Sequence, residues 1–151
     1  MQQFAFIGFG EVGTRFAADL KTHADITVTA FDLRQGDAER GPQMRHTAEA
    51  LGVRLAPNAA DASRNAAIVI SAVTASQTVN AAEAAAAFLK PGQIFFDVNS
   101  AAPGTKQRAA QAIAPSGARY VEGAVMAAVA QLGIKVPILA GGAAADRKSV
   151  V

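Results

Sequence analysis

The chain has 151 residues, of which 51% are hydrophobic and 17% are charged, a balance typical of one folded domain and not of a disordered chain. The formal net charge is only +2, basic residues are scattered and tryptophan is absent, so a nucleic-acid groove is not indicated. No apolar run approaches the roughly 20 residues that a membrane span needs. The absence of cysteine excludes disulfides, thiolate metal sites and cysteine nucleophiles, and together with a start that lacks a secretory signal it favours a cytoplasmic location.

Short apolar runs alternate with helical patterns along the chain. We predict strands over residues 3–7, 26–33, 67–71, 93–98, 119–125 and 135–140. We predict helices over residues 11–22, 43–51, 77–89 and 105–114, with a weak polar turn or short helix at 61–65. Strands that are apolar on both faces and alternate with helices indicate parallel βαβ units. The expected fold class is therefore α/β, with a Rossmann-type, doubly wound, mostly parallel sheet.

The strongest chemical signal is a glycine-rich segment between the first predicted strand and the first predicted helix. It reads Gly8-Phe9-Gly10-Glu11-Val12-Gly13. Gly8 permits a tight turn, Gly10 leaves the backbone open to a pyrophosphate, and Gly13 lets the helix pack close to the strand. The helix N-terminus offers unpaired N–H groups to the phosphates. We therefore expect this segment to bind a dinucleotide, with the Glu11 side chain facing solvent.

An acidic residue ends the second predicted strand. In dinucleotide-binding folds, a carboxylate roughly 20 residues after the glycine motif accepts hydrogen bonds from the adenosine ribose hydroxyls. Asp32 follows Gly13 at close to this spacing. A carboxylate there repels a 2′-phosphate and favours NAD, whereas Arg34 could contact a 2′-phosphate and keeps NADP open. The alternative interpretation is a glycine-rich turn of another α/β protein, in which Asp32 caps a helix.

The loop after the strand at 67–71 is a second candidate for cofactor contact, because ligands of an open parallel sheet lie beyond the carboxyl ends of its strands. It reads Ser71-Ala72-Val73-Thr74. We expect Val73 to pack on the nicotinamide side of the cofactor and Thr74 to lie beside it. The alternative is an ordinary loop in which Thr74 or Ser76 caps the following helix.

The loop after the next predicted strand carries the candidate substrate contacts. Asn99 and Ser100 place an amide and a hydroxyl at the sheet edge, where they can hold a substrate carboxylate or hydroxyl by neutral hydrogen bonds. Asp97 is expected to cap or order this loop. The alternative is capping of the helix that follows Pro103.

The remaining polar candidates are weaker. His23 and His46 lack metal-ligand spacing to each other or to a carboxylate, so no metal site is expected. Isolated lysines are by default solvated, and this default applies to Lys90, Lys106 and Lys135.

Together these segments resemble the N-terminal domain of the β-hydroxyacid dehydrogenases, a group that includes hydroxyisobutyrate dehydrogenase and the cofactor domain of phosphogluconate dehydrogenase. Four blocks carry the resemblance, in chain order: 7–13, 71–74, 97–103, and 120–125 followed by 138–142. The resemblance implies an NAD(P)-dependent oxidoreductase that transfers hydride between nicotinamide and a small hydroxy acid.

The sequence departs from the family's pattern in three places. Asn99-Ser100 stands where Ser-Thr is usual, and Met126-Ala127-Ala128 stands where Ser-Gly-Gly is usual, which implies a bulkier or less polar substrate. The family's catalytic lysine, on a helix after the last strand, has no counterpart here, because Lys148 comes too early to match it. The catalytic residue is therefore unknown, and we expect catalytic activity only if a C-terminal all-helical domain, absent from these 151 residues, is supplied.

We accordingly expect residues 1–142 to form an NAD(P)-binding Rossmann domain and residues 143–151 to be the truncated start of the following helix or a tail. Two alternative functions remain: a non-catalytic NAD(P)-binding module or truncated product, and an imine-reductase-like relative that does not need the lysine. The expected partners are a dinucleotide and a small hydroxy acid, without nucleic acid or membrane. A second copy or the missing C-terminal domain is expected against the uncovered faces.

Overall fold

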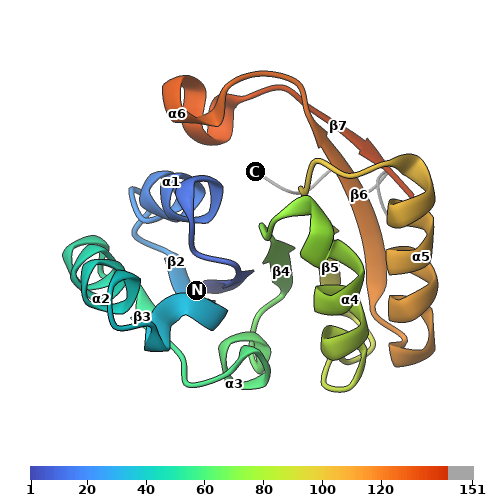
Figure 1. Ribbon diagram of the computed structural model, residues 1–151, viewed down its shortest axis with the longest axis horizontal. Helices are drawn as coiled ribbons and strands as arrows, with labels where there is room; N and C mark the ends of the chain where they lie inside the picture. The colour runs from blue at the N-terminus through green and yellow to red at the C-terminus, as the bar shows by residue number, and fades with distance from the viewer. Residues whose placement is uncertain (143–151) are drawn as a thin grey trace.

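The computed structural model describes residues 1–142, which form a seven-stranded sheet with helices on both of its faces (Figure 1). The strands are β1 (Gln2–Ile7), β2 (Ile26–Phe31), β3 (Arg54–Leu55), β4 (Ile68–Ser71), β5 (Ile94–Asp97), β6 (Arg119–Val125) and β7 (Ile138–Gly141). Their order is β3-β2-β1-β4-β5-β6-β7, and among them β7 alone is antiparallel to its neighbour. The chain changes direction across the sheet between β1 and β4, as in a doubly wound fold. The predicted fold class is confirmed.

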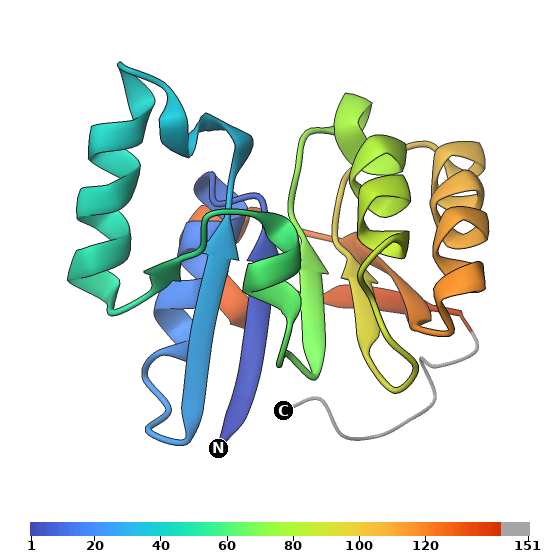
Figure 2. The same cartoon turned by 90° about the horizontal axis from the view of Figure 1, so that it is seen from below.

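Helices cover the two faces in separate groups (Figure 2). The α-helices are α1 (Glu11–Leu20), α2 (Arg40–Leu51), α3 (Ala59–Ser63), α4 (Thr78–Ala86), α5 (Pro103–Ile113) and α6 (Val129–Leu132). Short 3₁₀ segments are η1 (Leu33–Gly36), η2 (Ala75–Gln77), η3 (Ala114–Ser116) and η4 (Gly133–Lys135). One hydrophobic cluster contains residues of α1, α2 and α6, and the other contains residues of α4 and α5.

Strand β1 shows why the sheet is buried on both sides. Successive side chains of a strand point to opposite faces. Phe4 and Phe6 therefore pack in the cluster of α1, while Ala5 and Ile7 pack in the cluster of α4 and α5. Full burial of a large apolar side chain contributes about 1.5–3 kcal/mol. A strand segment with apolar residues on both faces, such as residues 4–7, is stable only in the middle of such a three-layer arrangement.

One β-strand and one α-helix of the described chain were not predicted. Strand β3 is only two residues long and pairs at the sheet edge, so it carries no periodic signal. Helix α6 is a four-residue turn.

Helix α2 begins at Arg40 and not at residue 43, since Pro42 lies in the first turn, where its missing N–H has no helical partner. The last predicted strand begins at Ile138 and not at residue 135, because η4 occupies the start of that range.

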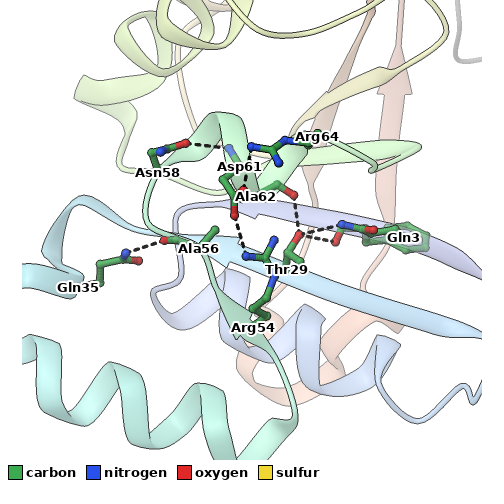
Figure 3. Close-up of polar contacts among 10 residues, drawn as sticks. Gln3, Thr29, Gln35, Arg54, Ala56, Asn58, Asp61, Ala62 and Arg64 are labelled. Atoms are coloured by element: carbon green, nitrogen blue, oxygen red, sulfur yellow. Dashed lines mark hydrogen bonds and ion pairs between the residues drawn. The ribbon is translucent and has the colours of Figure 1, made fainter.

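Polar contacts fasten α3 and β3 to each other (Figure 3). The Asn58 side chain caps α3 by accepting the N–H of Asp61 at 2.8 Å. The carboxylate of Asp61 pairs with Arg54 of β3 at 2.7 Å and with Arg64 at 3.0 Å. The polar turn or short helix predicted at 61–65 is therefore a capped helix that begins slightly earlier.

After β6 the chain crosses over α1 before it returns as β7 (Figure 1). The N–H of Ile134 donates to the carboxylate of Asp19 in α1 at 2.8 Å, and Val129 and Val136 are buried in the same cluster as Phe16. Residues 126–137 therefore form a crossing segment that lies on the first helix and begins at the carboxyl end of β6.

None of the helices within residues 1–142 is long and apolar enough to span a bilayer. The predicted terminal segment 143–151, with Lys148, lies outside the described residues.

Candidate dinucleotide-binding site

The turn between β1 and α1 is built on close backbone contacts. Gly8 has a φ of +95°, and a Cβ there would collide with the carbonyl oxygen of Ala72. A Cβ at Gly13 would collide with the carbonyl oxygen of Gly8. At Gly10, in contrast, a Cβ would have no protein atom within 4 Å, and the residue is exposed. Packing therefore requires glycine at positions 8 and 13, whereas the space at Gly10 is open to a ligand.

Helix α1 begins directly after this turn without a side-chain cap. Its N-cap residue is Gly10, and the N–H of Thr14 donates to the Gly10 carbonyl at 2.9 Å. The Phe9 ring is buried in the core and anchors the turn, Val12 packs partly against the same cluster, and Glu11 is exposed, as expected. The first N–H groups of a helix lack intrahelical partners and carry a partial positive charge. The turn therefore presents donors suited to an anion.

The carboxylate of Asp32 joins this turn to the end of β2. Its Oδ2 accepts the N–H of Phe9 at 2.8 Å, and its Oδ1 accepts the N–H of Arg34 at 2.8 Å. The N–H of Asp32 donates to Oε1 of Gln35 at 3.2 Å, which completes a capping box on η1. An ionised carboxylate has about four acceptor positions, and the backbone uses two. Asp32 is thus a cap that retains acceptors for the hydroxyls of a ligand.

The residues after Asp32 are open to solvent. Leu33 is 80% exposed, and Arg34 is exposed as well. Arg34 forms none of the side-chain ion pairs seen within residues 1–142. The exposed side chains of Leu33 and Arg34 therefore follow the Asp32 carboxylate just beyond the carboxyl end of β2.

The loop after β4 lies beside the glycine turn, because the Ala72 N–H donates to the carbonyl of Ile7 at 2.8 Å. Val73 is partly buried against the cluster of α4 and α5, and Thr74 is exposed. Neither η2 nor α4 has a side-chain cap, so the alternative in which Thr74 or Ser76 caps a helix is wrong.

The Asn99 side chain connects this loop to the one after β5. Asn99 is 5% exposed; its Oδ1 accepts the Val73 N–H at 2.7 Å and its Nδ2 donates to Oγ of Ser71 at 3.1 Å. Helix α5 has Ala102 as its N-cap residue, without a side-chain cap, so neither Asn99 nor Ser100 caps it. Asn99 is used within the protein, while Ser100 is exposed at the edge. Substrate binding by this pair stays a prediction.

A buried ion pair lies directly behind the β5 loop. Nζ of Lys106 donates to Oδ1 of Asp97 at 2.9 Å and to the Asp97 carbonyl at 3.0 Å. The Tyr120 hydroxyl donates to Oδ2 of Asp97 at 2.7 Å, and the Asn99 N–H donates to Oδ1 at 2.9 Å. Burial, and next the bond to Asp97, raises the pKa of the Tyr120 phenol well above its usual range. Asp97 orders its loop, as expected, but through partners that were not predicted.

The prediction that Lys106 is a solvated surface lysine is wrong, since its exposed fraction is 3%. The helical pattern contained the signal: Lys106 lies one turn before Ala109 and two turns before Ile113, both fully buried. Lys90 and Lys135 are exposed, as predicted.

A groove of about 630 Å³ opens next to the glycine turn, between α1 and α2. It is lined by Phe9, Gly10, Glu11, Thr14, Arg15, Glu39, Arg40, Gln43, Met44, Thr47 and Ala130. The turn therefore faces an accessible hollow. In the part of the chain that the structure describes, no group of three or more His, Cys, Asp or Glu side chains is placed to hold a metal ion.

Comparison with known proteins places this geometry in a family. A family model described as the NAD binding domain of 6-phosphogluconate dehydrogenase matches residues 3–150. No curated protein matches the chain.

Solved structures share the fold. A conserved hypothetical protein from Sinorhizobium meliloti 1021 is 39% identical, with a TM-score of 0.87 over 93% of this chain and 46% of that one. The 3-hydroxyisobutyrate dehydrogenase of Mycobacterium tuberculosis is 23% identical, with a TM-score of 0.79 over 94% of this chain and 47% of that one. An imine reductase from Pseudomonas sp. is 18% identical, with a TM-score of 0.74 over 92% and 46%. The chain spans about half the length of these proteins.

Proposed function

Because the chain belongs to the family of the NAD-binding domain of 6-phosphogluconate dehydrogenase, we propose that it is the cofactor-binding domain of an oxidoreductase that transfers hydride between a nicotinamide dinucleotide and a small hydroxy acid. Three features meet at the carboxyl ends of β1 and β2, and this observation carries the proposal. They are the uncapped start of α1, the open space at Gly10 and the carboxylate of Asp32.

These residues fit a dinucleotide. The N–H groups at the start of α1 would hold the pyrophosphate, which requires the backbone at Gly10 to remain unobstructed. The remaining acceptors of Asp32 would receive the adenosine ribose hydroxyls. The exposed Leu33 side chain would pack on the adenine. Val73 would support the nicotinamide side of the cofactor.

NAD is the proposed cofactor in preference to NADP. The Asp32 carboxylate would repel a 2′-phosphate on the adenosine ribose, and two backbone hydrogen bonds support this role by fixing its position. Arg34 is exposed and can be drawn toward such a phosphate, so it lessens the discrimination without removing the carboxylate.

When bound, the nicotinamide supplies or accepts the hydride. Ser100 would orient the substrate by its exposed hydroxyl. Met126, Ala127 and Ala128 are exposed just beyond the carboxyl end of β6 and would give the substrate a mostly apolar surface. The lysine that moves the proton in the β-hydroxyacid dehydrogenases has no match in the described residues.

Fluorescence titration with NADH and NADPH tests cofactor binding. We expect the full chain to bind NADH more tightly than NADPH, and Gly10→Ala to weaken both complexes at least tenfold while the melting temperature changes little. Gly141→Ala is the matched control, because a Cβ there also meets no atom within 4 Å but lies on β7. Failure of the chain to bind either dinucleotide would contradict the proposal.

Activity assays with small 3-hydroxy acids and with cyclic imines then separate the possible reactions. Because the described residues supply no lysine to move the proton, we expect at most slow oxidation of a hydroxy acid by this chain. Imine reduction alone would assign the chain to the second chemistry, and tight NADH binding without turnover of either class would identify a non-catalytic binding module.

A further inference from the structure

We propose that Asp97, Lys106 and Tyr120 are positioning residues that lock the β5 loop onto the β4 loop and thereby set the distance between the nicotinamide support and the substrate contact. The proposal rests on the proposed function, since it concerns the geometry of that same site.

A buried ion pair is a costly way to stabilise a fold. Asp97 is fully buried and Lys106 is 3% exposed, so both charges have left water. Replacement of such a pair by apolar residues is often neutral or stabilising. Lys106 also lies near the start of α5, where the helix dipole disfavours a cation. The pair is therefore better explained by the geometry that it imposes on its neighbours than by its contribution to stability.

The Asp97 carboxylate is used entirely within the protein. Oδ1 accepts from Lys106 and from the Asn99 N–H, and Oδ2 accepts from the Tyr120 hydroxyl. A fully buried carboxylate with these donors does not reach a ligand. It acts through Asn99, whose backbone it fixes.

Asn99 passes this constraint to the neighbouring loop. Its amide oxygen accepts the Val73 N–H and its amide nitrogen donates to Ser71, which is itself fully buried. Ser100, the next residue, is exposed at the edge. The positions of Val73 and Ser100 relative to each other are thus set by one connected network.

Tyr120 is the member that can be removed most cleanly. Its ring stacks on Phe95 with centroids 6.2 Å apart and an angle of 22° between the planes. The Tyr120→Phe variant keeps this ring and loses only the hydroxyl that fixes Oδ2 of Asp97. Because the phenol stays protonated, the contact does not weaken across the neutral pH range.

The test compares binding of NADH with binding of ADP-ribose, which has the same adenosine and pyrophosphate but no nicotinamide. We expect Tyr120→Phe to weaken NADH binding by up to about tenfold, because the two loops are then less ordered before the nicotinamide binds, and to leave ADP-ribose binding unchanged. The double variant Asp97→Asn/Lys106→Met should do the same. Thr29→Val is the matched control. It also removes a buried hydroxyl, which lies on β2 and donates to the Ala62 carbonyl at 2.6 Å.

An equal loss of affinity for both ligands, or a lower melting temperature with an unchanged ratio of the two affinities, would show a structural role only and overturn the proposal. Hydrogen exchange of the Val73 amide without ligand keeps this test independent of cofactor binding. Faster exchange in Tyr120→Phe than in the wild type supports the network, and equal exchange overturns it. Absence of dinucleotide binding by the wild type would refute the proposed function instead.

Discussion

The carboxylate of Asp32 accepts the main-chain N–H of Phe9 at 2.8 Å, a contact between residues 23 positions apart. It orients the glycine turn from outside the turn itself and draws the end of β2 toward the start of α1. The same carboxylate caps η1, so its position is determined from two sides before any ligand binds.

We predict that Asp32→Asn changes cofactor preference. Loss of the negative charge removes the repulsion of a 2′-phosphate, and Arg34 is then free to attract it. The ratio of the dissociation constants for NADPH and NADH should fall at least tenfold, measured by fluorescence titration. Asp25→Asn removes an exposed carboxylate at the opposite end of β2 and should leave the ratio unchanged. An unaltered ratio in Asp32→Asn would place the adenosine ribose elsewhere.

Substitution of alanine should affect stability much more at Gly13 than at Gly10. A Cβ at Gly13 meets the Gly8 carbonyl oxygen, so Gly13→Ala should lower the free energy of unfolding by roughly 1–3 kcal/mol. Gly10→Ala meets no atom and should change it by less than about 0.5 kcal/mol. Urea unfolding of both variants checks the difference, and equal losses would contradict the close approach of α1 to the turn.

Much of this architecture was predictable because its signals are local. Strands with apolar residues on both faces and a glycine-rich turn are read directly from consecutive residues, and both lie where expected. Strand β3 and helix α6 are too short for any periodic pattern, and they depend on contacts with distant elements.

Lys106 shows a different reason for failure. The helical spacing puts Lys106 on the buried face with Ala109, whereas the general preference of lysine for solvent predicts exposure. Its partner Asp97 precedes it in another element, so the charge compensation became visible only in three dimensions. Likewise, Asn99 was predicted for its chemistry at the sheet edge, but its burial follows from the packing of two loops.

Removal of one member of the buried pair should cost more than removal of both. Lys106→Met leaves the Asp97 carboxylate buried without its cation, and we expect a loss of about 3–5 kcal/mol in the free energy of unfolding. Asp97→Asn/Lys106→Met should recover most of that loss. Lys90→Met, at an exposed lysine, should stay within about 0.5 kcal/mol of the wild type. Additive losses in the double variant would disprove the coupling.

The contact between α3 and β3 should make stability depend on acidity. The hydrogen bond from Arg54 holds the pKa of Asp61 below its usual value of 3.8. The ionised carboxylate therefore contributes stability that is fully present above about pH 4 and is lost as the pH falls through the lowered pKa. The difference in unfolding free energy between wild type and Asp61→Asn should be constant from pH 5 to 7 and shrink below pH 4.

Arg54→Met provides the control for that prediction, because it removes the main cause of the lowered pKa. In this background the acid-induced loss should begin at the same pH, near the unfolded-state pKa, but be smaller than in the wild type, because the folded and unfolded pKa values of Asp61 then lie closer together. Urea unfolding measured from pH 3 to 7 gives both curves, and superimposable profiles would contradict the assignment.

The bond between Ile134 and Asp19 joins residues 115 positions apart. During synthesis, α1 therefore emerges from the ribosome long before the crossing segment that covers it. The apolar surface that later contacts Val129 and Val136 stays exposed to solvent until almost the whole described chain has been translated. Non-local closure of this kind is slow, because the entropy of a long loop is lost before the contact forms. On the nascent domain, the first helix to be synthesised is thus an exposed hydrophobic surface to which chaperones can bind.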